Sequence, residues 1–490
     1  MQLKLTFFWL CLCSLLLLCS CTQEQTAVVT TESVQTTVGE IPEELLGIPA
    51  TADFGGAEYR ILSAGNLTYE DFTFEESSSM PLNNAQYKRK TLVEQNYNIT
   101  IAEDTQKAYS SGNGPGFQAL YTAANAGTTD YAVGLIAGYD VSVLGYSGYL
   151  YDMNSMPGID LSKSWWDQKA NDALTIHDLV FFTAGDYTLA DNDAAYVIMF
   201  NKSILDNYGL DSPYDMVYDN EWTLETFGTL CKTVTEDLDQ NGIMDENDRF
   251  GLLVWVDSLL GMVNAAGQRC CVIDDKDQIV LSLYNETTLD AVDRFLEIAL
   301  DKQYALQYQS IRNSVEFEEQ LWSGEHGLFW TTYMGNIPRF REMESDFGLL
   351  PYPKLTETQD SYYSTVTPFN SQFVCVPLVQ ENVERTATIT EALAYYGQQI
   401  VLPAYYEVNL KGMVSRDEES SDMLDIIFDN LVYDLGFLYQ IGPYNKNFNY
   451  MISRGTTNFT SVYNSLEPVA KAQLTLINNG FAKAAAMWQD

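Results

Sequence analysis

Short apolar segments alternate with amphipathic ones along most of the chain. Five consecutive apolar residues at 196–200 stand between polar residues and predict a strand that is buried on both faces. The same patterning predicts further strands at 59–62, 98–101, 250–256, 326–332 and 372–377. It predicts helices at 84–97, 118–126, 223–235, 285–302, 313–324, 382–396 and 421–433. Alternating strands and helices favour an α/β chain whose mostly parallel sheets carry helices on both faces.

The stretch 185–223 predicts a passage between two lobes. A polar turn leads into the buried strand, and the amphipathic segment after it can end at Gly209, a residue suited to a helix C-terminus. Ser212 and Pro213 mark a turn, and Thr223 can cap a new helix. A chain of 490 residues exceeds one ordinary core, so two lobes are expected.

These residues resemble the lobe crossing of the extracellular solute-binding proteins of ABC importers, in the maltose-binding-protein-like group. The matching positions are Gly185, Asp186, Tyr187, Phe200, Asn201, Lys202, Tyr208, Gly209, Leu210, Ser212, Pro213, Tyr214, Trp222 and Thr223, with a later match at 347–354. The resemblance implies a type II periplasmic-binding-protein-like fold, with two hinge-connected lobes that each hold a mostly parallel sheet flanked by helices. It implies a first lobe at 53–193, a second lobe at 194–363, a return to the first lobe at 364–414, and a helical segment at 415–490, mainly in the second lobe.

The N-terminus has the pattern of an export signal. Residues 1–20 hold one lysine, Lys4, before an apolar run that is short for a membrane span. Residues 18–21 resemble a bacterial lipobox, which makes Cys21 the lipid-bearing residue; an ordinary signal cleaved after a small residue is the alternative. Residues 21–52, rich in Thr, Glu and Gln, predict a flexible tether. We therefore expect an extracytoplasmic protein that is attached to the bacterial cell membrane by its lipid anchor only.

Composition narrows the function classes. A formal net charge of −41 argues against nucleic acid as a partner, because phosphate binding needs clustered Lys and Arg. Only two histidines are present, His177 and His326, which removes most His-based metal sites and catalytic triads. With 67 acidic residues, carboxylate-pair glycosidase chemistry stays open.

The segment 237–248 matches a twelve-residue calcium-loop pattern. Asp237, Asp239, Asn241, Asp245 and Asp248 place oxygen ligands at positions 1, 3, 5, 9 and 12, and Ile243 would offer its backbone carbonyl at position 7. Gly242 stands where the loop must turn sharply. Position 12 holds Asp in place of the usual Glu, and the pattern predicts that a strand follows instead of a second helix. We expect an isolated structural Ca²⁺ site; the alternative is an acidic surface turn.

The aromatic content of 32 Tyr, 23 Phe and 8 Trp suits either cores or a sugar site, since sugar rings present apolar faces to aromatic planes. By resemblance, Trp255, Trp330 and Tyr333 lie near ligand-contacting places in the second lobe, and Asp186, Tyr187 and Asp193 lie at the crossing. Ordinary core packing is an equal alternative for each of them.

Four cysteines follow Cys21 without metal-site spacing, and buried thiols are the preferred interpretation. A disulfide from Cys231 to Cys270 or Cys271 stays possible.

Together these features predict a monomeric, lipid-anchored solute-binding protein that is not an enzyme. It would capture a solute, with a sugar or oligosaccharide as the expected class, by closure of its lobes and deliver it to ABC permease subunits in the membrane. The alternatives are an extracellular carbohydrate-active enzyme and a surface scaffold lipoprotein.

Overall fold

The computed structural model describes residues 47–66, 70–76, 80–107, 111–340, 342–406 and 418–488. These residues all belong to one unit, Pro42–Asp490. The predicted signal segment, Cys21 and most of the predicted tether lie outside the described residues. Within the described part of the chain, no helix combines the length and the apolar character that crossing a membrane requires.

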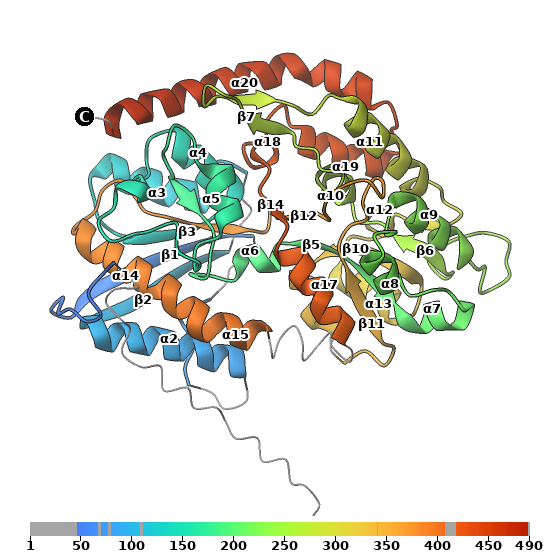
Figure 1. The fold of residues 1–490 in the computed structure, drawn as a ribbon, viewed down its shortest axis with the longest axis horizontal. Coiled ribbons are helices and arrows are strands. Elements are labelled where there is room, and N and C mark those ends of the chain that lie inside the picture. Colours follow the sequence, from blue (N-terminus) through green and yellow to red (C-terminus); the bar gives the residue numbers. More distant parts are fainter. Residues whose placement is uncertain are drawn as a thin grey trace, which may run out of the picture. The chain divides into compact units, whose positions relative to one another are not determined.

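Two five-stranded sheets form the centres of the two lobes (Figure 1). The first sheet has the order β2-β1-β3-β13-β4, with β1 (Ala57–Gly65), β2 (Ile99–Lys107), β3 (Val133–Ala137), β4 (Phe182–Thr183) and β13 (Gln372–Cys375). The second has the order β11-β5-β10-β6-β9, with β5 (Tyr196–Asn201), β6 (Phe250–Leu253), β9 (Ala305–Leu306), β10 (Gly327–Tyr333) and β11 (Phe347–Leu350).

One strand in each sheet runs against the other four. Strand β13 is antiparallel to both β3 and β4, and strand β5 is antiparallel to both β10 and β11. The remaining pairings are parallel. Each reversed strand is the first strand that the chain forms in its sheet after crossing from the other lobe. The predicted fold class, an α/β chain with two mostly parallel sheets, is confirmed.

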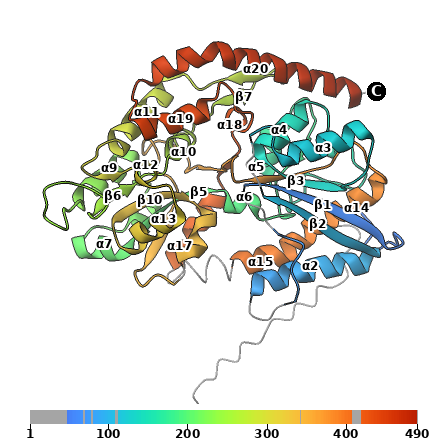
Figure 2. The same ribbon diagram turned by 180° about the vertical axis from the view of Figure 1, so that it is seen from behind.

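Helices cover both faces of the first sheet. Helices α3 and α4 contact one face, and α2 and α14 lie on the other (Figures 1 and 2). The helical elements of this lobe are α2 (Pro81–Tyr97), α3 (Pro115–Ala126), α4 (Gly138–Tyr146), a 3₁₀ turn (Met153–Ser155), α5 (Gln168–Leu174), α14 (Val383–Tyr396), a π-helical turn (Gly397–Val401) and α15 (Leu402–Ala404).

Side-chain caps begin helices of the second lobe, and the sequence predicted the one at Thr223. Thr223 and Asn285 accept hydrogen bonds from the backbone at the starts of α9 and α11, and Gly209 ends α7 with a φ of 62°. The helical elements are α7 (Lys202–Tyr208), α8 (Pro213–Tyr218), α9 (Leu224–Thr233), α10 (Ser258–Ala265), α11 (Glu286–Ala299), α12 (Tyr308–Ile311), α13 (Val315–Ser323), a 3₁₀ segment (Met334–Phe340) and α17 (Glu418–Phe428).

The C-terminal helices α18 (Leu435–Leu438), α19 (Tyr444–Arg454) and α20 (Phe459–Trp488) complete the structure. Helix α20 contacts both lobes. Near its start, the Tyr463 ring stacks 4.6 Å from that of Tyr284; near its end, the Phe481 ring stacks 6.0 Å from that of Phe181. A small hairpin of β7 (Cys271–Ile273) and β8 (Ile279–Leu281) lies beside α20 (Figure 1).

Some local predictions are wrong. The helix expected at 421–433 ends at Phe428, because Leu431 and Val432 form strand β14 (Leu431–Val432), which pairs with β12 (Ser364–Thr365). Ser212 and Pro213 start helix α8 instead of marking a turn, since the Ser212 side chain accepts a hydrogen bond from the Tyr214 amide.

All four cysteines within the described residues, Cys231, Cys270, Cys271 and Cys375, are buried thiols. The structure thus contains no disulfide between Cys231 and either of the adjacent pair.

Candidate functional site

Three chain segments connect the lobes side by side. The first runs through α6 (Ala190–Asp193) into β5; the second and third contain β12 and β14. The Thr367 amide donates to the Ala194 carbonyl at 2.9 Å, and the Val366 amide donates to the Val432 carbonyl at 3.0 Å. The sequence predicted the first two crossings and missed the third, because its two strand residues follow a helix without a turn signal.

A cavity of about 690 Å³ lies beside these crossings, and both lobes contribute to its wall. Its volume is within the range of small-molecule sites. Its aromatic lining residues are Tyr139, Tyr196, Trp255, Tyr308, Tyr333 and Phe369. Its amide lining residues are Gln309, Asn313, Asn336, Asn370, Gln440, Asn445 and Asn449, and its charged ones are Asp257, Glu318, Arg339 and Lys446.

Trp255 and Tyr333, two of the predicted ligand residues, line the cavity together. Strands β6 and β10 are parallel, so their carboxyl ends meet at one sheet edge, where both side chains stand. The Trp255 ring lies 5.5 Å from the Tyr333 ring and 4.8 Å from the Tyr196 ring. The Trp255 amide donates to Thr331 Oγ1 at 3.0 Å, which fixes the start of the loop. These rings form one aromatic wall that can face a flat apolar ligand surface.

Trp330, a third predicted ligand residue, does not line the cavity. Side chains alternate between the faces of a strand, so Trp330 and Tyr333 of β10 point to opposite faces. The Trp330 side chain is only 1% exposed, and its indole nitrogen donates to the Tyr308 hydroxyl at 3.2 Å. Trp330 therefore supports a residue of the cavity wall from behind.

The predicted crossing residues Asp186 and Tyr187 also lie away from the cavity lining. Gln398 Nε2 donates to Asp186 Oδ2 at 3.1 Å, and burial raises the pKa of Asp186 to about 7. The Tyr187 side chain is fully buried, and the Tyr187 carbonyl accepts a hydrogen bond from Arg89 at 2.7 Å. Gly185 precedes them in a conformation with φ +151°, where a Cβ would lie 2.5 Å from the Trp165 carbonyl oxygen. Ligand contact by this pair stays a prediction.

Asp193, the last predicted crossing residue, accepts a hydrogen bond from the Tyr405 hydroxyl at 2.7 Å. Burial raises the pKa of Asp193 to about 6. This carboxyl ties α6 to the segment after α15, and it is not among the residues that line the cavity. Its contact with a ligand likewise stays a prediction.

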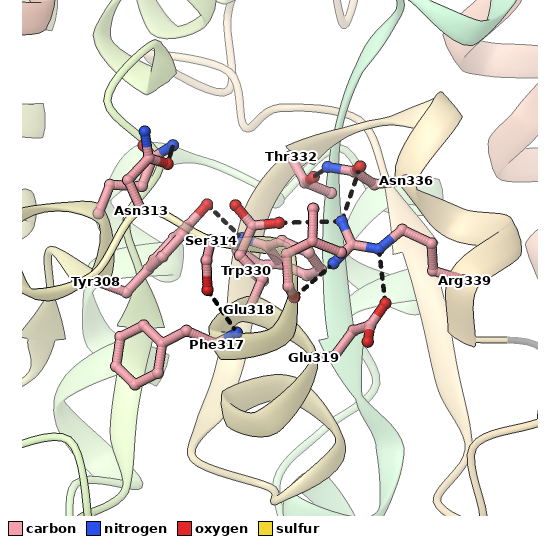
Figure 3. A network of polar contacts seen from close by, with 12 residues as sticks. Tyr308, Asn313, Ser314, Phe317, Glu318, Glu319, Trp330, Thr332, Asn336 and Arg339 are labelled. Carbon is pink, nitrogen blue, oxygen red and sulfur yellow. Dashed lines mark hydrogen bonds and ion pairs between the residues drawn. The ribbon is translucent and has the colours of Figure 1, made fainter.

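Sequence reasoning missed the charged residues of the cavity. Asp257 follows Trp255 by two positions, and burial raises the pKa of its carboxyl to about 6 although the Asn449 side chain hydrogen-bonds to it. Glu318 on α13 and Arg339 on the 3₁₀ segment form an ion pair of 3.0 Å (Figure 3). The position of Asp257 at a strand's carboxyl end was a usable signal; the pairing of Glu318 with Arg339 was not visible in the sequence.

One hydrogen bond joins two residues of the cavity lining that come from distant parts of the chain. Asn445 Nδ2 on α19 donates to the Tyr139 hydroxyl on α4 at 2.9 Å. The Asn449 Oδ1 atom, one turn further along α19, is buried and has no hydrogen-bond partner among the described residues. Helix α19 thus brings amide groups to the cavity from a segment in which the sequence predicted no ligand contact.

The predicted calcium loop brings three of its carboxylates together. Asp237, Asp239 and Asp248 place an oxygen each within 4.8 Å of one another, and Asp248 is fully buried. The Gly242 amide donates to Asp237 Oδ2 at 2.8 Å. Carboxylate oxygens are the hard ligands that Ca²⁺ prefers. Asp245 is not one of these three carboxylates, and its Oδ1 accepts a hydrogen bond from the Asn247 amide at 3.0 Å.

Two other predicted ligands of the loop have clear placements. Asn241 Oδ1 accepts a hydrogen bond from the Ile243 amide at 2.7 Å. The Ile243 side chain is exposed, as expected for a residue that would contribute only its carbonyl. The loop is followed by strand β6, as the sequence suggested.

No protein-family model matches this sequence, and no curated protein matches it either. Solved structures do share its fold. An ABC substrate-binding protein from Listeria monocytogenes, in complex with cycloalternan, is 14% identical over 85% of this chain and 99% of its own, with a TM-score of 0.55. A cyclic α-maltosyl-1,6-maltose binding protein from Arthrobacter globiformis is 12% identical over 87% of this chain and 100% of its own, with a TM-score of 0.57.

A third solved structure, a family 1 extracellular solute-binding protein from Bifidobacterium longum subsp. infantis, is 14% identical over 88% of this chain and 100% of its own, with a TM-score of 0.54. At such identities the likeness concerns the fold, and it extends over nearly the whole length of each neighbour. This chain therefore has the two-lobed fold of the family 1 solute-binding proteins of ABC transporters.

Proposed function

We propose that this protein is the solute-binding component of an ABC importer, and that it captures a carbohydrate in the cavity between its lobes. The observation that carries the proposal is the aromatic wall of Trp255 and Tyr333 beside the three crossings. Aromatic planes hold the apolar faces of sugar rings, while the amide and carboxyl groups around them can bind hydroxyls. The carbohydrates named with the structural neighbours support the same ligand class.

Capture proceeds by closure of the lobes. Because the three crossings are hydrogen-bonded to one another, they can bend together and let the lobes move as rigid bodies. A ligand that contacts both walls favours the closed state by its additional contacts there. The test is titration with a panel of neutral oligosaccharides, followed by calorimetry and small-angle scattering. Saturable binding with a smaller radius of gyration is expected. If no glycan of the panel binds, the proposal is overturned.

The protein acts as a binder and not as an enzyme. Chromatography of the same glycans after long incubation with purified protein is expected to show them unchanged. Hydrolysis of any one of them with many turnovers per protein molecule, lost on substitution of Asp257 or Glu318, would favour a carbohydrate-active enzyme instead.

Delivery to a permease needs a position at the membrane. The lipobox-like sequence around Cys21 supports lipidation there, with the protein working as a monomer that stands off the membrane on its tether. Cys21→Ser is expected to move the protein out of the membrane fraction or to leave it unprocessed. A processed Cys21→Ser variant that stays in the membrane fraction would contradict the anchor.

The loop at 237–248 holds a structural Ca²⁺ ion in this proposal. The three converging carboxylates repel one another unless a cation lies between them, so binding stabilises the folded state. We expect a higher melting temperature in Ca²⁺ than in chelator, and no such difference in the Asp237→Ala, Asp239→Ala variant. Equal melting temperatures of the wild type in Ca²⁺ and in chelator would exclude the site. Asp274→Ala, in another acidic turn, serves as the control.

A further inference from the structure

The only arginine among the described cavity-lining residues is already committed to other groups. Arg339 Nη1 donates to Glu318 Oε2 at 3.0 Å and to Asn336 Oδ1 at 3.1 Å, and Arg339 Nη2 donates to the Val315 carbonyl at 2.9 Å. Arg339 Nε donates to Glu319 Oε1 at 3.1 Å. Four of its five donor hydrogens are thus used, and two carboxylates share its charge. Figure 3 shows the guanidinium held among these partners.

Of the two carboxylates that bind Arg339, Glu318 is the one that lines the cavity. Its side chain is 13% exposed and lines the cavity, whereas Glu319 does not. Only one Glu318 oxygen binds Arg339; the other points away from it, toward the side where Tyr308 lies (Figure 3). Burial raises the pKa of Glu318, and the hydrogen bond and charge of Arg339 oppose that shift. Arg339 therefore holds Glu318 with one acceptor oxygen left for another donor.

The other charged groups of the wall do not offset this carboxylate. Asp257 adds a second carboxyl group beside Trp255. Lys446, the second lining cation, has an exposed side chain, and its Nζ lies 5.7 Å from the centre of the Tyr450 ring. Water screens such an exposed charge far more than it screens the half-buried Glu318. A carboxylate on the ligand would lie near the carboxyl groups of Glu318 and Asp257, while the Arg339 guanidinium that could bind it is already engaged. A hydroxyl on the ligand could donate a hydrogen bond to the same carboxyl groups.

We propose that the cavity selects an uncharged glycan and rejects acidic ones, with Glu318 accepting a ligand hydroxyl and Arg339 acting as the positioning residue that holds Glu318 in place. This inference rests on the carbohydrate-binding function proposed above, and it narrows the substrate class. The preference for uncharged glycans then depends on Arg339, which lines the cavity but is ion-paired with Glu318 and Glu319.

Calorimetry at physiological salt tests the inference with matched trisaccharides: maltotriose, cellotriose and xylotriose as neutral probes, and trigalacturonate as the acidic probe. Wild-type protein is expected to bind at least one neutral probe, at least tenfold tighter than trigalacturonate. Glu318→Gln should weaken that neutral probe about tenfold, the effect of one lost charge-assisted hydrogen bond. Glu319→Gln, the control, should leave it unchanged.

Two further variants separate positioning from packing. Glu318→Gln combined with Glu319→Gln releases the Arg339 charge, so trigalacturonate binding should rise at least tenfold. Arg339→Lys keeps a charge but loses the planar fork, so neutral binding should fall while the wild-type rejection of trigalacturonate persists. Melting curves of all variants, with and without the neutral probe, identify any that fail to fold; for those, the wild-type preference decides alone.

Three results would overturn the inference. Trigalacturonate binding as tight as that of the best neutral probe would refute the specificity and leave carbohydrate binding intact. Equal neutral affinities of folded Glu318→Gln and wild type would remove Glu318 from the site. Failure of wild type to bind any probe in this set or in the wider glycan panel would overturn the proposed function, and this inference with it.

Discussion

The cavity wall of the second lobe and the crossing side of the first lobe carry the same kinds of residues, aromatic rings and carboxyl groups, in opposite states. At the crossing, Tyr187 and Asp193 are engaged by Arg89 and Tyr405. On the wall, Trp255 faces the cavity, and Glu318 keeps an oxygen beyond its ion pair. The difference shows that residue type alone does not mark a binding site here. A binding site is marked instead by polar groups that keep hydrogen-bonding capacity and by rings that the rest of the protein does not bury.

The largest expected effect comes from the crossing side. Arg89 is 1% exposed; it donates to the Tyr187 and Asp71 carbonyls and lies 4.3 Å from the Phe72 ring centre. Arg89→Ala would leave the buried Asp71 carboxyl without its cation. We expect a loss of about 3–5 kcal/mol in the free energy of unfolding, measured by urea denaturation.

The control for this change is Lys88→Ala, one position earlier on α2, whose exposed side chain should matter by less than about 0.5 kcal/mol. The folded fraction of the Arg89→Ala protein should bind glycan with wild-type affinity. A selective loss of affinity without a loss of stability would mean that the crossing side belongs to the ligand site after all.

The cavity wall should show the reverse behaviour. Trp255→Ala removes the ring that faces the cavity, and we expect glycan affinity to fall by about 1–3 kcal/mol, measured by calorimetry. Trp330→Phe keeps a ring in the covered position and should change affinity by less than about 0.5 kcal/mol. If Trp330→Phe weakens binding as much as Trp255→Ala does, the ring that lines the cavity and the ring buried behind it contribute alike, and the comparison is wrong.

Much of the fold followed from the sequence because burial patterns and caps are local. The strand at 196–200 and the cap at Thr223 were predictable from a few neighbouring residues. The strand β14 was not, since its two residues are strand only through their pairing with β12. A pairing between distant segments leaves no local pattern.

The candidate site was less predictable for a related reason. The resemblance placed Trp255, Trp330 and Tyr333 in one region, but the alternation along β10 turns Trp330 to the covered face. Glu318 and Arg339 come from different elements, and only the folded chain brings them within 3.0 Å. Whether a polar side chain is free or engaged depends on its neighbours in space, which the sequence does not contain.

A smaller effect separates the two regions by pH. Burial raises the pKa of Asp193 from 3.8 to about 6, so between these values the folded state holds a proton that the unfolded state has lost. The free energy of unfolding then falls as pH rises through this window, and the cost of the buried charge remains above pH 6. Asp193→Asn keeps an acceptor for Tyr405 without the charge. We expect it to be more stable than wild type at pH 8 by about 1–2 kcal/mol, and not at pH 4.

Thermal melts at the two pH values measure this effect, and Asp219→Asn in an exposed turn is the control. A stability gain that is equal at both pH values would mean that charge is not its cause. Glycan affinity adds a second reading, because a loss of affinity in Asp193→Asn would place this carboxyl in the ligand site.

The smallest expected effect concerns Asp257, a carboxyl group of the cavity wall. Burial raises the pKa of this carboxyl to about 6. Its ionised form accepts hydrogen bonds from ligand hydroxyls at two oxygens, and protonation removes part of that capacity. Glycan affinity should therefore fall as pH is lowered through about 6, and Asp257→Asn should weaken binding at pH 7.5 by about 0.5–1.5 kcal/mol and flatten the pH profile. The groups that face Asp257 are Asn449, Tyr196 and Tyr352, and neither tyrosine titrates in this range. Calorimetry from pH 5 to 8 decides the point. An affinity that rises as Asp257 takes up its proton would show that the protonated carboxyl donates a hydrogen bond to the ligand. Asp257 would then not be an acceptor for ligand hydroxyls, as Glu318 is proposed to be.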